Sequence, residues 1–419
     1  MFGKKSPDVL VVGAGPVGML SALLLVKRGI PVKIIDKEER KAGHSYALGL
    51  HPASLKLLDE VGLLDKILEE CYKIRTIGLF DHDSRRSELR LSPLEEDFSF
   101  LAVISQNALE RVLEEELKKN GVTVMWNHRL STLEPHHSHV SVAVDKLVSE
   151  SMGYAVAHTE KLVGKTLKME VPFVIGADGY SSIVRRLSQI DFNQVGDSHN
   201  FAVYEFVTDV DLNNDSVIAL DENSTNVLWP LSHNRCRWGF QLTDVTASNI
   251  NRDKGRLAIF LGQGRYPWLS TDFLKTMIQE RAPWFKGNID QVYWSVVVCF
   301  EHRLVSTYGR GHVWLAGDAA HLTGPVGMQS MNVGLREAYT LSSNIADILG
   351  SGGSRDLLAE YNENQIHEWN VLHGMKGGLK GNSNTDPWIS QFSDRLLSCL
   401  PGSCHDLPAL AKQLNLDLV

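Results

Sequence analysis

A glycine-rich turn near the start of the chain constrains the fold more than any other feature. The run Asp8–Val12 is apolar and β-branched without polar alternation, which is typical of a parallel strand covered on both faces. Residues 13–18 then read Gly-x-Gly-x-x-Gly and lead directly into an apolar helix. A second strand, Val32–Ile35, ends in Asp36, 23 residues beyond Gly13, where an acid accepts hydrogen bonds from ribose hydroxyls. This order predicts a βαβ unit that binds a dinucleotide.

Each glycine of the turn has a separate physical role. Gly13 permits a tight turn, Gly15 lets the backbone approach a pyrophosphate, and Gly18 lets the helix pack against the strand. Amides near Pro16 and Val17, together with the positive end of the helix dipole, hold the phosphates. Glycine turns of purely structural origin are common. The prediction therefore depends on the strands, the helix and the acid that surround this turn.

Two later motifs follow apolar strands in the same way. The strand at 171–175 runs into Gly-Ala-Asp-Gly-x-Ser-Ser-x-Val-Arg at 176–185. The strand at 312–316 runs into Gly-Asp-Ala-Ala-His at 317–321, and a glycine-punctuated loop then leads into a long helix. Small residues such as Gly327 let a backbone pass close to a ring, and the free amides of a helix N-terminus stabilise an anion there.

Taken together, the three motifs resemble those of the class A flavoprotein monooxygenases, the family of para-hydroxybenzoate hydroxylase, phenol hydroxylase and polyketide aromatic hydroxylases. The resemblance covers residues 8–350 or so. It implies an FAD-dependent monooxygenase in which NADPH or NADH reduces the flavin transiently and molecular oxygen then forms a C4a-hydroperoxyflavin. The expected reaction is hydroxylation of a small aromatic or polyketide-like substrate, with the cofactor supplying the difficult chemistry.

The resemblance also implies roles for single residues. Asp318 would bind the flavin ribityl chain and Asp178 would act near the pyrophosphate, although Asp318 alone would equally fit a helix N-cap. The helix start at 329–332 would lie against the flavin pyrimidine ring, and Gln106 would contact the flavin. The predicted cofactor-binding residues are Gly13, Gly15, Pro16, Val17, Gly18, Asp36, Lys37, Gln106, Leu130, Asp178, Gly179, Gly317, Asp318, Pro325, Gly327, Met328, Gln329 and Asn332.

The chain departs from the family pattern at two places. Met328 stands where many relatives have a second glycine, and Tyr46-Ala47 stands where many carry Arg-Ala. Lys37 or Arg40 would then replace the missing arginine. No catalytic residue is predicted, because Tyr204, Trp229 and His233 lie on or beside an aromatic-rich sheet where such residues usually pack.

The fold class predicted is α/β, with a Rossmann-like FAD-binding domain built on a parallel sheet, a substrate domain built on an antiparallel sheet, and a helical C-terminus. The FAD-binding domain is assigned to 1–75, 102–189 and 301–350 and the substrate domain to 76–101 and 190–300, while 351–419 forms the C-terminal segment. The patterns also predict helices at 106–119 and 271–281, a strand at 122–126 and an antiparallel meander at 130–172.

Composition argues against several other classes of protein. A net charge of −8 gives no support for nucleic-acid binding. Five scattered cysteines without C-x-x-C spacing argue against a disulfide frame and a zinc site. The histidines at 136, 137 and 139 lack further ligands at metal spacing and fit a surface turn, so no metal is predicted. No apolar run approaches the roughly 20 residues that span a bilayer. We expect a cytoplasmic monomer or homodimer.

Several alternatives share the motifs. A flavin-dependent halogenase has the same fold, but the chain lacks Trp-x-Trp-x-Ile-Pro and instead carries Trp229-Pro230-Leu231. A prenyl-chain reductase or epoxidase of the same superfamily is compatible with the modest aromatic content. A non-catalytic flavin-binding module is the alternative from a different class.

Overall fold

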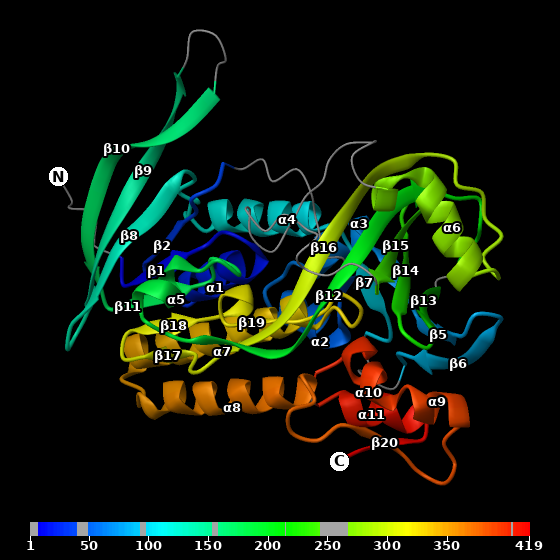
Figure 1. Ribbon diagram of the computed structural model, residues 1–419. Coiled ribbons are helices and arrows are strands. Elements are labelled where there is room, and N and C mark those ends of the chain that lie inside the picture. Colours follow the sequence, from blue (N-terminus) through cyan, green and yellow to red (C-terminus); the bar gives the residue numbers. More distant parts are fainter. Residues whose placement is uncertain are drawn as a thin grey trace.

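The structure is a computed structural model that describes residues 7–39, 49–92, 98–152, 158–213, 215–243, 267–403 and 405–419. Arg40 and Tyr46-Ala47 lie outside the described residues. Figure 1 shows a parallel sheet with helices packed on it, a large antiparallel sheet beside it and a small C-terminal module. These elements confirm the predicted α/β architecture. The division into domains at the stated boundaries stays a prediction.

Sheet A carries the glycine-rich turn. Its strand order is β17 (Gly309–Arg310), β18 (Val313–Leu315), β11 (Phe173–Gly176), β1 (Val9–Val12) and β2 (Val32–Ile35). All neighbours pair in parallel except β17, which pairs antiparallel to β18. The strands β1, β11 and β18 are fully buried, as their continuous apolar sequences require. The three predicted motifs therefore leave the same edge of one sheet, at the carboxyl ends of adjacent strands.

The predicted strand at 122–126 was wrong. Only Met125 pairs with the sheet, through an isolated parallel bridge to Ile35. Val122 and Val124 are buried in the core without a regular ladder. Both belong to the main hydrophobic core, and burial alone gives the same sequence signal as a short buried strand.

Helices cover sheet A. Those nearest to it are α1 (Pro16–Lys27), α4 (Gln106–Lys119), α5 (Ile183–Leu187) and α7 (Gln329–Ser351), with α8 (Asp356–Leu372) outside α7. Helix α4 has the predicted bounds, because Ser105 caps its first turn by accepting a hydrogen bond from the Ala108 amide. Two short helices, α2 (Pro52–Glu60) and α3 (Leu64–Glu70), complete this layer.

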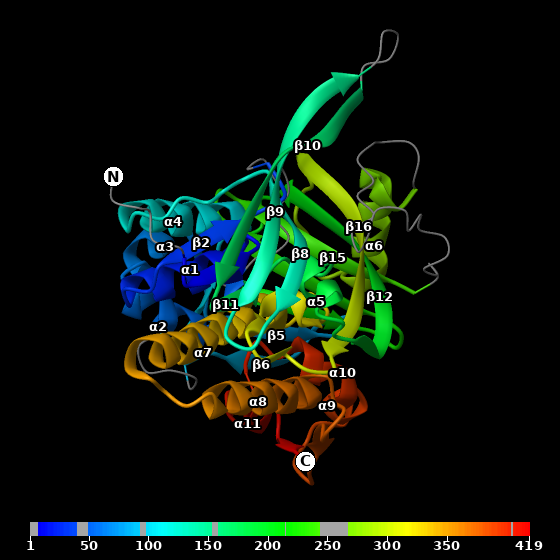
Figure 2. The ribbon, with the colours of Figure 1, turned by 90° about the vertical axis from the view of Figure 1, so that its left-hand side faces the viewer.

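A three-stranded meander lies at one end of the molecule. It consists of β8 (His128–Pro135), β9 (Val140–Met152) and β10 (His158–Val171), paired antiparallel. The predicted meander thus exists. Figure 2 shows its long hairpin extending past the rest of the chain. A second small sheet contains β3 (Gly49–Leu50), β7 (Leu101–Val103) and β4 (Tyr72–Ile74) and connects α2 to α4.

Sheet C is the eight-stranded, mainly antiparallel sheet that the aromatic-rich region predicts. Its strand order is β19 (His321–Leu322), β16 (Val292–Val305), β12 (Phe192–Val207), β15 (Arg235–Leu242), β14 (Thr225–Leu231), β13 (Asp215–Leu220), β5 (Thr76–Phe80) and β6 (Arg85–Arg90). Only β13 and β5 pair in parallel among these described strands. Helix α6 (Thr271–Arg281), at its predicted bounds, covers the outer face.

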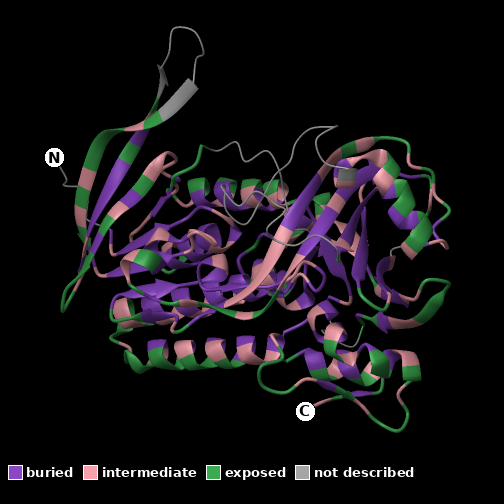
Figure 3. Ribbon diagram, in the orientation of Figure 1, coloured by how far each residue is buried: buried purple, intermediate pink, exposed green. Residues whose placement is uncertain are grey.

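The C-terminal module contains strands as well as helices. Its elements are β20 (Leu379–Gly381), α9 (Pro387–Gln391), α10 (Ser393–Leu396), the 3-10 turn η4 (Leu397–Cys399), α11 (Leu407–Gln413) and β21 (Leu416–Leu418). The strands pair with each other, so the prediction of a purely helical end needs this correction. Figure 3 shows burial concentrated in sheet A and the inner strands of sheet C. Within the described ranges, the helices are all too short or too polar to cross a membrane.

Candidate active site

One cavity of about 380 Å³ lies where the three motifs and sheet C meet. Its lining comes from the glycine-rich turn, from the segments after β11 and β18, and from one face of sheet C. Eight of the predicted residues line it: Gly15, Pro16, Val17, Gln106, Gly179, Asp318, Pro325 and Met328. The cavity therefore brings together segments that are far apart in the sequence.

The glycine-rich turn shows which of its glycines the fold itself requires. Gly13 has φ of +105°, and a Cβ there would lie 2.2 Å from the Ala177 carbonyl oxygen. A Cβ at Gly18 would lie 2.0 Å from the Gly13 carbonyl oxygen. By contrast, a Cβ at Gly15 would meet nothing within 4 Å, and Gly15 faces the cavity. Gly13 and Gly18 are required by packing, whereas at Gly15 the missing side chain leaves the cavity open.

Asp36 holds the glycine-rich turn in place. One carboxylate oxygen accepts a 2.7 Å hydrogen bond from the Ala14 amide, and the other accepts one of 2.8 Å from the Glu38 amide. Lys37 is exposed, and its Nζ lies 3.4 Å from the Ser181 hydroxyl. Leu130 is buried in the hydrophobic core on β8. None of Asp36, Lys37 and Leu130 lines the cavity.

Asp178 directs its carboxylate away from the cavity. It accepts hydrogen bonds from the Ser182 hydroxyl at 2.5 Å and from the Ile183 amide at 2.6 Å, at the start of α5. Burial raises the pKa of the carboxyl, although these hydrogen bonds oppose the rise. The cavity is instead lined by its neighbours Ala177, Gly179 and Tyr180. Asp178 thus fixes the conformation of this segment without lining the cavity.

Gly317 and Asp318 are held by two different helical positions on α7. Gly317 has φ of +65°, and its amide donates a 2.7 Å hydrogen bond to Glu337. Asp318 lines the cavity, and its Oδ1 accepts a 2.6 Å hydrogen bond from the Ser330 hydroxyl. The N-cap of α7 is Met328, so Asp318 is not its cap.

Glu337 is the centre of a buried polar cluster beneath this loop. Its Oε2 accepts from the Gly317 amide and from His321 Nε2 at 3.0 Å, and its Oε1 accepts from the Tyr308 hydroxyl at 2.8 Å and Trp369 Nε1 at 3.2 Å. Burial by itself raises the pKa of the carboxyl, but His321 and the hydrogen bonds outweigh it and hold the pKa below its usual value. Glu337 stays ionised and fixes the backbone of Gly317.

Asn332 joins α7 to the segment 49–54. Its side-chain oxygen accepts from the His51 amide and the Ser54 hydroxyl, both at 2.7 Å, and its nitrogen donates to the carbonyls of Gly49 and Met328. These four bonds satisfy the amide fully. Asn332 therefore positions the start of α7, and its side chain is not part of the cavity lining.

The C-terminal module supports the same loop from outside. The Gly327 amide donates to the Ser398 carbonyl at 3.1 Å, and Gln329 Nε2 donates to the Leu400 carbonyl at 3.2 Å. A Cβ at Gly327 would lie 2.7 Å from the Ser398 carbonyl oxygen. His51 contacts the Gly327 carbonyl at 2.9 Å, and burial lowers the pKa of this histidine to about 4. Neither Gly327 nor Gln329 lines the cavity.

Sheet C closes the cavity with one of its two faces. Side chains on its strands alternate, so Tyr204, Trp238 and Phe240 point into the core under α6. The opposite face contributes the residues Phe201, Val203, Val227, Trp229, Arg237, Gly239, Trp294, Val298 and Phe300 to the cavity. The sequence did not single out Arg237 or Trp294. The strand register, which pairs Glu205 with both residues, places them on the same face of the sheet.

Of the three residues that the sequence placed near the sheet, only Trp229 reaches the cavity. Tyr204 donates a hydrogen bond to the Trp268 carbonyl on the outer side, and burial raises the pKa of its hydroxyl. His233 is exposed in the turn between β14 and β15. Neither Tyr204 nor His233 lines the cavity, and their assignment as structural residues stays a prediction.

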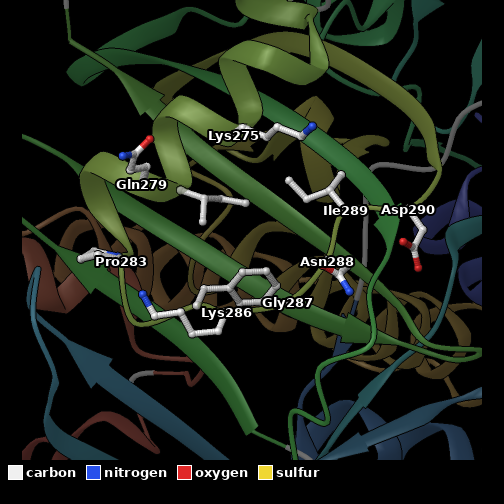
Figure 4. Close-up of a pocket in the computed structure, with 10 residues that line it drawn as sticks. Lys275, Gln279, Pro283, Lys286, Gly287, Asn288, Ile289 and Asp290 are labelled. Carbon is white, nitrogen blue, oxygen red and sulfur yellow. The ribbon is translucent and has the colours of Figure 1, made fainter.

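A second hollow lies on the outer side of sheet C. Figure 4 shows it between α6 and the segment 283–290, with Lys275, Lys286 and Asp290 at its edge. It is separated from the three motifs by the sheet itself. None of its lining residues belongs to a predicted motif. Throughout the described ranges, no three His, Cys, Asp or Glu side chains are grouped in a way that could hold a metal.

Comparison with known proteins decides the family. The family profile described as an FAD binding domain matches residues 6–369. The chain belongs to this FAD-binding family. The family match and two relatives that are monooxygenases confirm the resemblance to flavoprotein monooxygenases.

Curated relatives of this FAD-binding chain include proteins named as monooxygenases. A 6-methylpretetramide 4-monooxygenase of Streptomyces rimosus is 26% identical, with 86% of this chain and 59% of that protein covered. A pentachlorophenol 4-monooxygenase of Sphingobium chlorophenolicum is 25% identical, with 84% and 60% covered. The chain spans about three fifths of the length of these two relatives.

Solved structures confirm the fold. A p-nitrophenol 4-monooxygenase from Pseudomonas putida DLL-E4 matches with a TM-score of 0.72 at 19% identity, covering 98% of this chain and 93% of that one. A flavin-dependent halogenase also matches, with a TM-score of 0.69 at 18% identity over 88% of this chain and 63% of that one. The fold of this FAD-binding chain therefore does not separate hydroxylases from halogenases.

The residues present fit FAD. The open space beside Gly15, at the start of α1, offers amide groups and a helix dipole to a pyrophosphate. Asp318 and Met328 extend the same cavity toward the aromatic face of sheet C. Gly15, Pro16, Val17 and Asp318 would thus hold the cofactor directly, while Gly13, Asp36 and Glu337 fix the backbone around it.

At Met328 we expect glycine to be a more stabilising replacement than alanine, which is the reverse of the usual order. Its φ of +53° and ψ of +29° are left-handed, and its Sδ would lie 2.6 Å from a Cβ at Gly49. Met328→Ala loses the side-chain packing and keeps the strain, whereas Met328→Gly relieves the strain. We expect the glycine variant to be more stable than the alanine variant by about 1 kcal/mol in urea unfolding. The usual order, with alanine more stable, would contradict the strained conformation.

Proposed function

We propose that the chain is an FAD-dependent monooxygenase that uses NAD(P)H and molecular oxygen to hydroxylate a small aromatic or polyketide-like molecule. One observation carries the proposal: the cavity of the glycine-rich turn and Asp318 is continuous with a chamber walled by Phe201, Trp229, Trp294 and Phe300. Bound FAD would supply the activation of oxygen, with NAD(P)H as the source of electrons. The curated relatives at 25–26% identity carry out reactions named as monooxygenations.

Each part of the cavity has a task in this reaction. The turn at Gly15 and the side chain of Asp318 would bind and orient the cofactor. The aromatic face of sheet C would orient a flat substrate and exclude water from it. Glu337 and Asn332 would keep the loop between β18 and α7 in one conformation, because Glu337 accepts from the Gly317 amide near its start and Asn332 donates to the Met328 carbonyl at its end.

The activity is tested with the purified chain. We expect a yellow protein with an FAD spectrum, in which NAD(P)H oxidation rises when a phenol or polycyclic aromatic is added. A hydroxylated product should form, with one oxygen atom from ¹⁸O₂. Chloride incorporation into the substrate would identify a halogenase instead. A colourless protein that binds no FAD would contradict the proposal entirely.

Asp318 provides a residue-level prediction. Asp318→Ala removes a cavity-lining carboxylate and should lower FAD affinity by roughly 10-fold, which is the effect of about one charged hydrogen bond. Asp318→Asn keeps an acceptor for the Ser330 hydroxyl and should lose less. Equilibrium dialysis of FAD measures both. An alanine variant that purifies fully loaded, with unchanged affinity, would refute the assignment of Asp318 to the cofactor.

A further inference from the structure

Two thioethers lie in the cavity that the proposed function assigns to FAD. Among the described residues that line it, Met328 and Met331 are the only ones that contain sulfur. Met328 is the N-cap of α7, Met331 lies in the first turn of the same helix, and both residues are half-buried. A thioether is polarisable, and it accepts an oxygen atom from a peroxide to form a sulfoxide. The cavity thus contains oxidisable groups beside the residues that would hold the cofactor.

The proposed reaction itself supplies an oxidant. When reduced FAD meets molecular oxygen and no substrate takes up an oxygen atom, two electrons and two protons pass to O₂, FAD is reoxidised, and hydrogen peroxide leaves. One peroxide oxygen then bonds to the thioether sulfur, the O–O bond breaks, and water leaves. The sulfur loses two electrons and the peroxide gains them, so the step balances. Because the peroxide forms inside the cavity, it meets the side chains there before it reaches the solvent.

Met328 is packed so that an added oxygen atom has little choice of direction. A Cβ at Gly49 would lie 2.6 Å from Met328 Sδ and 2.9 Å from its Cε, so the thioether lies close against the Gly49 backbone. Asn332 ties these two residues together, because its side-chain nitrogen donates to the Gly49 carbonyl at 2.9 Å and to the Met328 carbonyl at 2.7 Å. A sulfoxide oxygen on Met328 must therefore point into the cavity or push the two segments apart.

A sulfoxide at this position changes both the shape and the polarity of the site. Oxidation converts an apolar side chain into a polar one, and a polar group that is buried without a hydrogen-bond donor is costly. An oxygen that points into the cavity takes up space that bound FAD would use. An oxygen that pushes Gly49 away displaces the start of α7 and the loop before it. Either change lowers the affinity for FAD.

We propose that Met328 is a redox modification site: hydrogen peroxide formed at FAD converts its thioether to the sulfoxide, and the sulfoxide weakens FAD binding. Turnover without substrate then limits itself, because a chain that releases peroxide loses its cofactor and stops consuming NAD(P)H. Enzymatic reduction of the sulfoxide returns the thioether and restores the site. The natural source of reduced FAD rests on the proposed function, in which NAD(P)H supplies the electrons.

The test uses the FAD-loaded chain and needs no NAD(P)H. FAD is reduced with dithionite without oxygen, excess dithionite is removed, and the protein is mixed with ¹⁸O₂ and catalase, which destroys peroxide in the bulk solution. After repeated cycles, mass spectrometry of peptides locates the ¹⁸O. We expect labelled sulfoxide at Met328 and none at Met375, which is 53% exposed. Peroxide added to the bulk solution without catalase should reverse this order, because exposure then decides which thioether reacts first.

FAD affinity before and after the cycles gives the functional readout. Wild-type protein should bind FAD roughly 5-fold or more weakly after the cycles. Met328→Leu has a similar volume and no sulfur, so its affinity should stay at its own untreated value. Met331→Leu is the matched control, because it removes the neighbouring thioether and keeps Met328, and it should lose affinity as the wild type does. Treatment of the oxidised wild type with methionine sulfoxide reductases should restore its affinity, which tests the same point without a substitution.

The outcomes separate this proposal from the proposed function. Labelled sulfoxide at Met328 together with weakened FAD binding supports the modification site even if no aromatic is hydroxylated. The absence of label at Met328, label at Met331 alone, or equal label at Met375 despite catalase overturns it. So does a Met328 sulfoxide that leaves FAD affinity unchanged, an equal loss of affinity in Met328→Leu, or a chain that binds no FAD. Hydroxylation of an aromatic by a chain whose Met328 stays unlabelled through the cycles would support the activity and refute the modification site.

Discussion

Gly15→Ala is expected to leave the protein folded and to lose FAD, whereas Gly13→Ala is expected to lose the fold. A methyl group at Gly15 meets no protein atom within 4 Å but enters the cavity. Its φ of −74° is compatible with alanine. The melting temperature without FAD should therefore change little, while FAD affinity should fall by at least about 10-fold, or about 1.4 kcal/mol.

Gly13 provides the contrast. Alanine there would combine a φ of +105° with a Cβ 2.2 Å from the Ala177 carbonyl oxygen, so β1 and β11 would have to separate. We expect a destabilisation of about 3 kcal/mol or more in urea unfolding. Calorimetric FAD titration and thermal unfolding of both variants measure the difference. A Gly15→Ala protein with unchanged FAD affinity would show that the pyrophosphate does not lie beside this turn.

Glu337→Gln should produce the largest loss of stability that a single polar change can cause at the site. A glutamine has one acceptor oxygen, so it keeps either the Gly317 and His321 partners or the Tyr308 and Trp369 partners, but not both pairs. We expect a loss of about 3–5 kcal/mol of unfolding free energy, as for other broken buried pairs. Urea unfolding measures it.

A surface glutamate serves as the control. Glu116 contacts Lys27, Lys66 and Lys119, and its side chain is 17% exposed. Glu116→Gln should cost at most about 1 kcal/mol, because solvent screens these pairs. Equal losses in Glu116→Gln and Glu337→Gln would show that the buried cluster has no special role in the fold.

The same cluster sets a pH dependence. The pKa of Glu337 is lower in the folded protein than in the unfolded chain, where it is near the ordinary value of 4.5. Its contribution to stability is therefore complete above that value and is lost as the pH falls through the lower, folded pKa. Wild-type protein should lose stability below pH 4.5 more steeply than Glu337→Gln does, as measured by urea unfolding across that range.

The sequence predicts well those features that depend on local pattern. Helix α4 has its predicted bounds because Ser105 supplies a cap and the apolar residues repeat with helical spacing. The strands that carry the three motifs also lie as predicted, because buried parallel strands have continuous apolar sequences. The predicted strand at 122–126 was wrong, since the same pattern can result from packing alone.

Features that depend on distant partners could not be predicted. Asp178 accepts hydrogen bonds from the first amides of α5, and Asn332 binds the segment 49–54, although the motif pattern alone suggests cofactor contacts for both. Glu337 has no sequence signal, because its four partners come from three separate segments. Arg237 was missed for a different reason. Both faces of β15 are buried, so polar and apolar residues do not sort by face, and only the register identifies the face that meets the cavity.

A crystal structure of the chain with FAD and an aromatic ligand tests the central claim most directly. That claim is that the glycine-rich turn, Asp318 and the aromatic face of sheet C enclose one continuous site. We predict the FAD pyrophosphate beside Gly15 and the ligand between the flavin and the strands that carry Trp229 and Trp294. FAD bound elsewhere, or a ligand bound in a hollow separated from the flavin, would contradict the account.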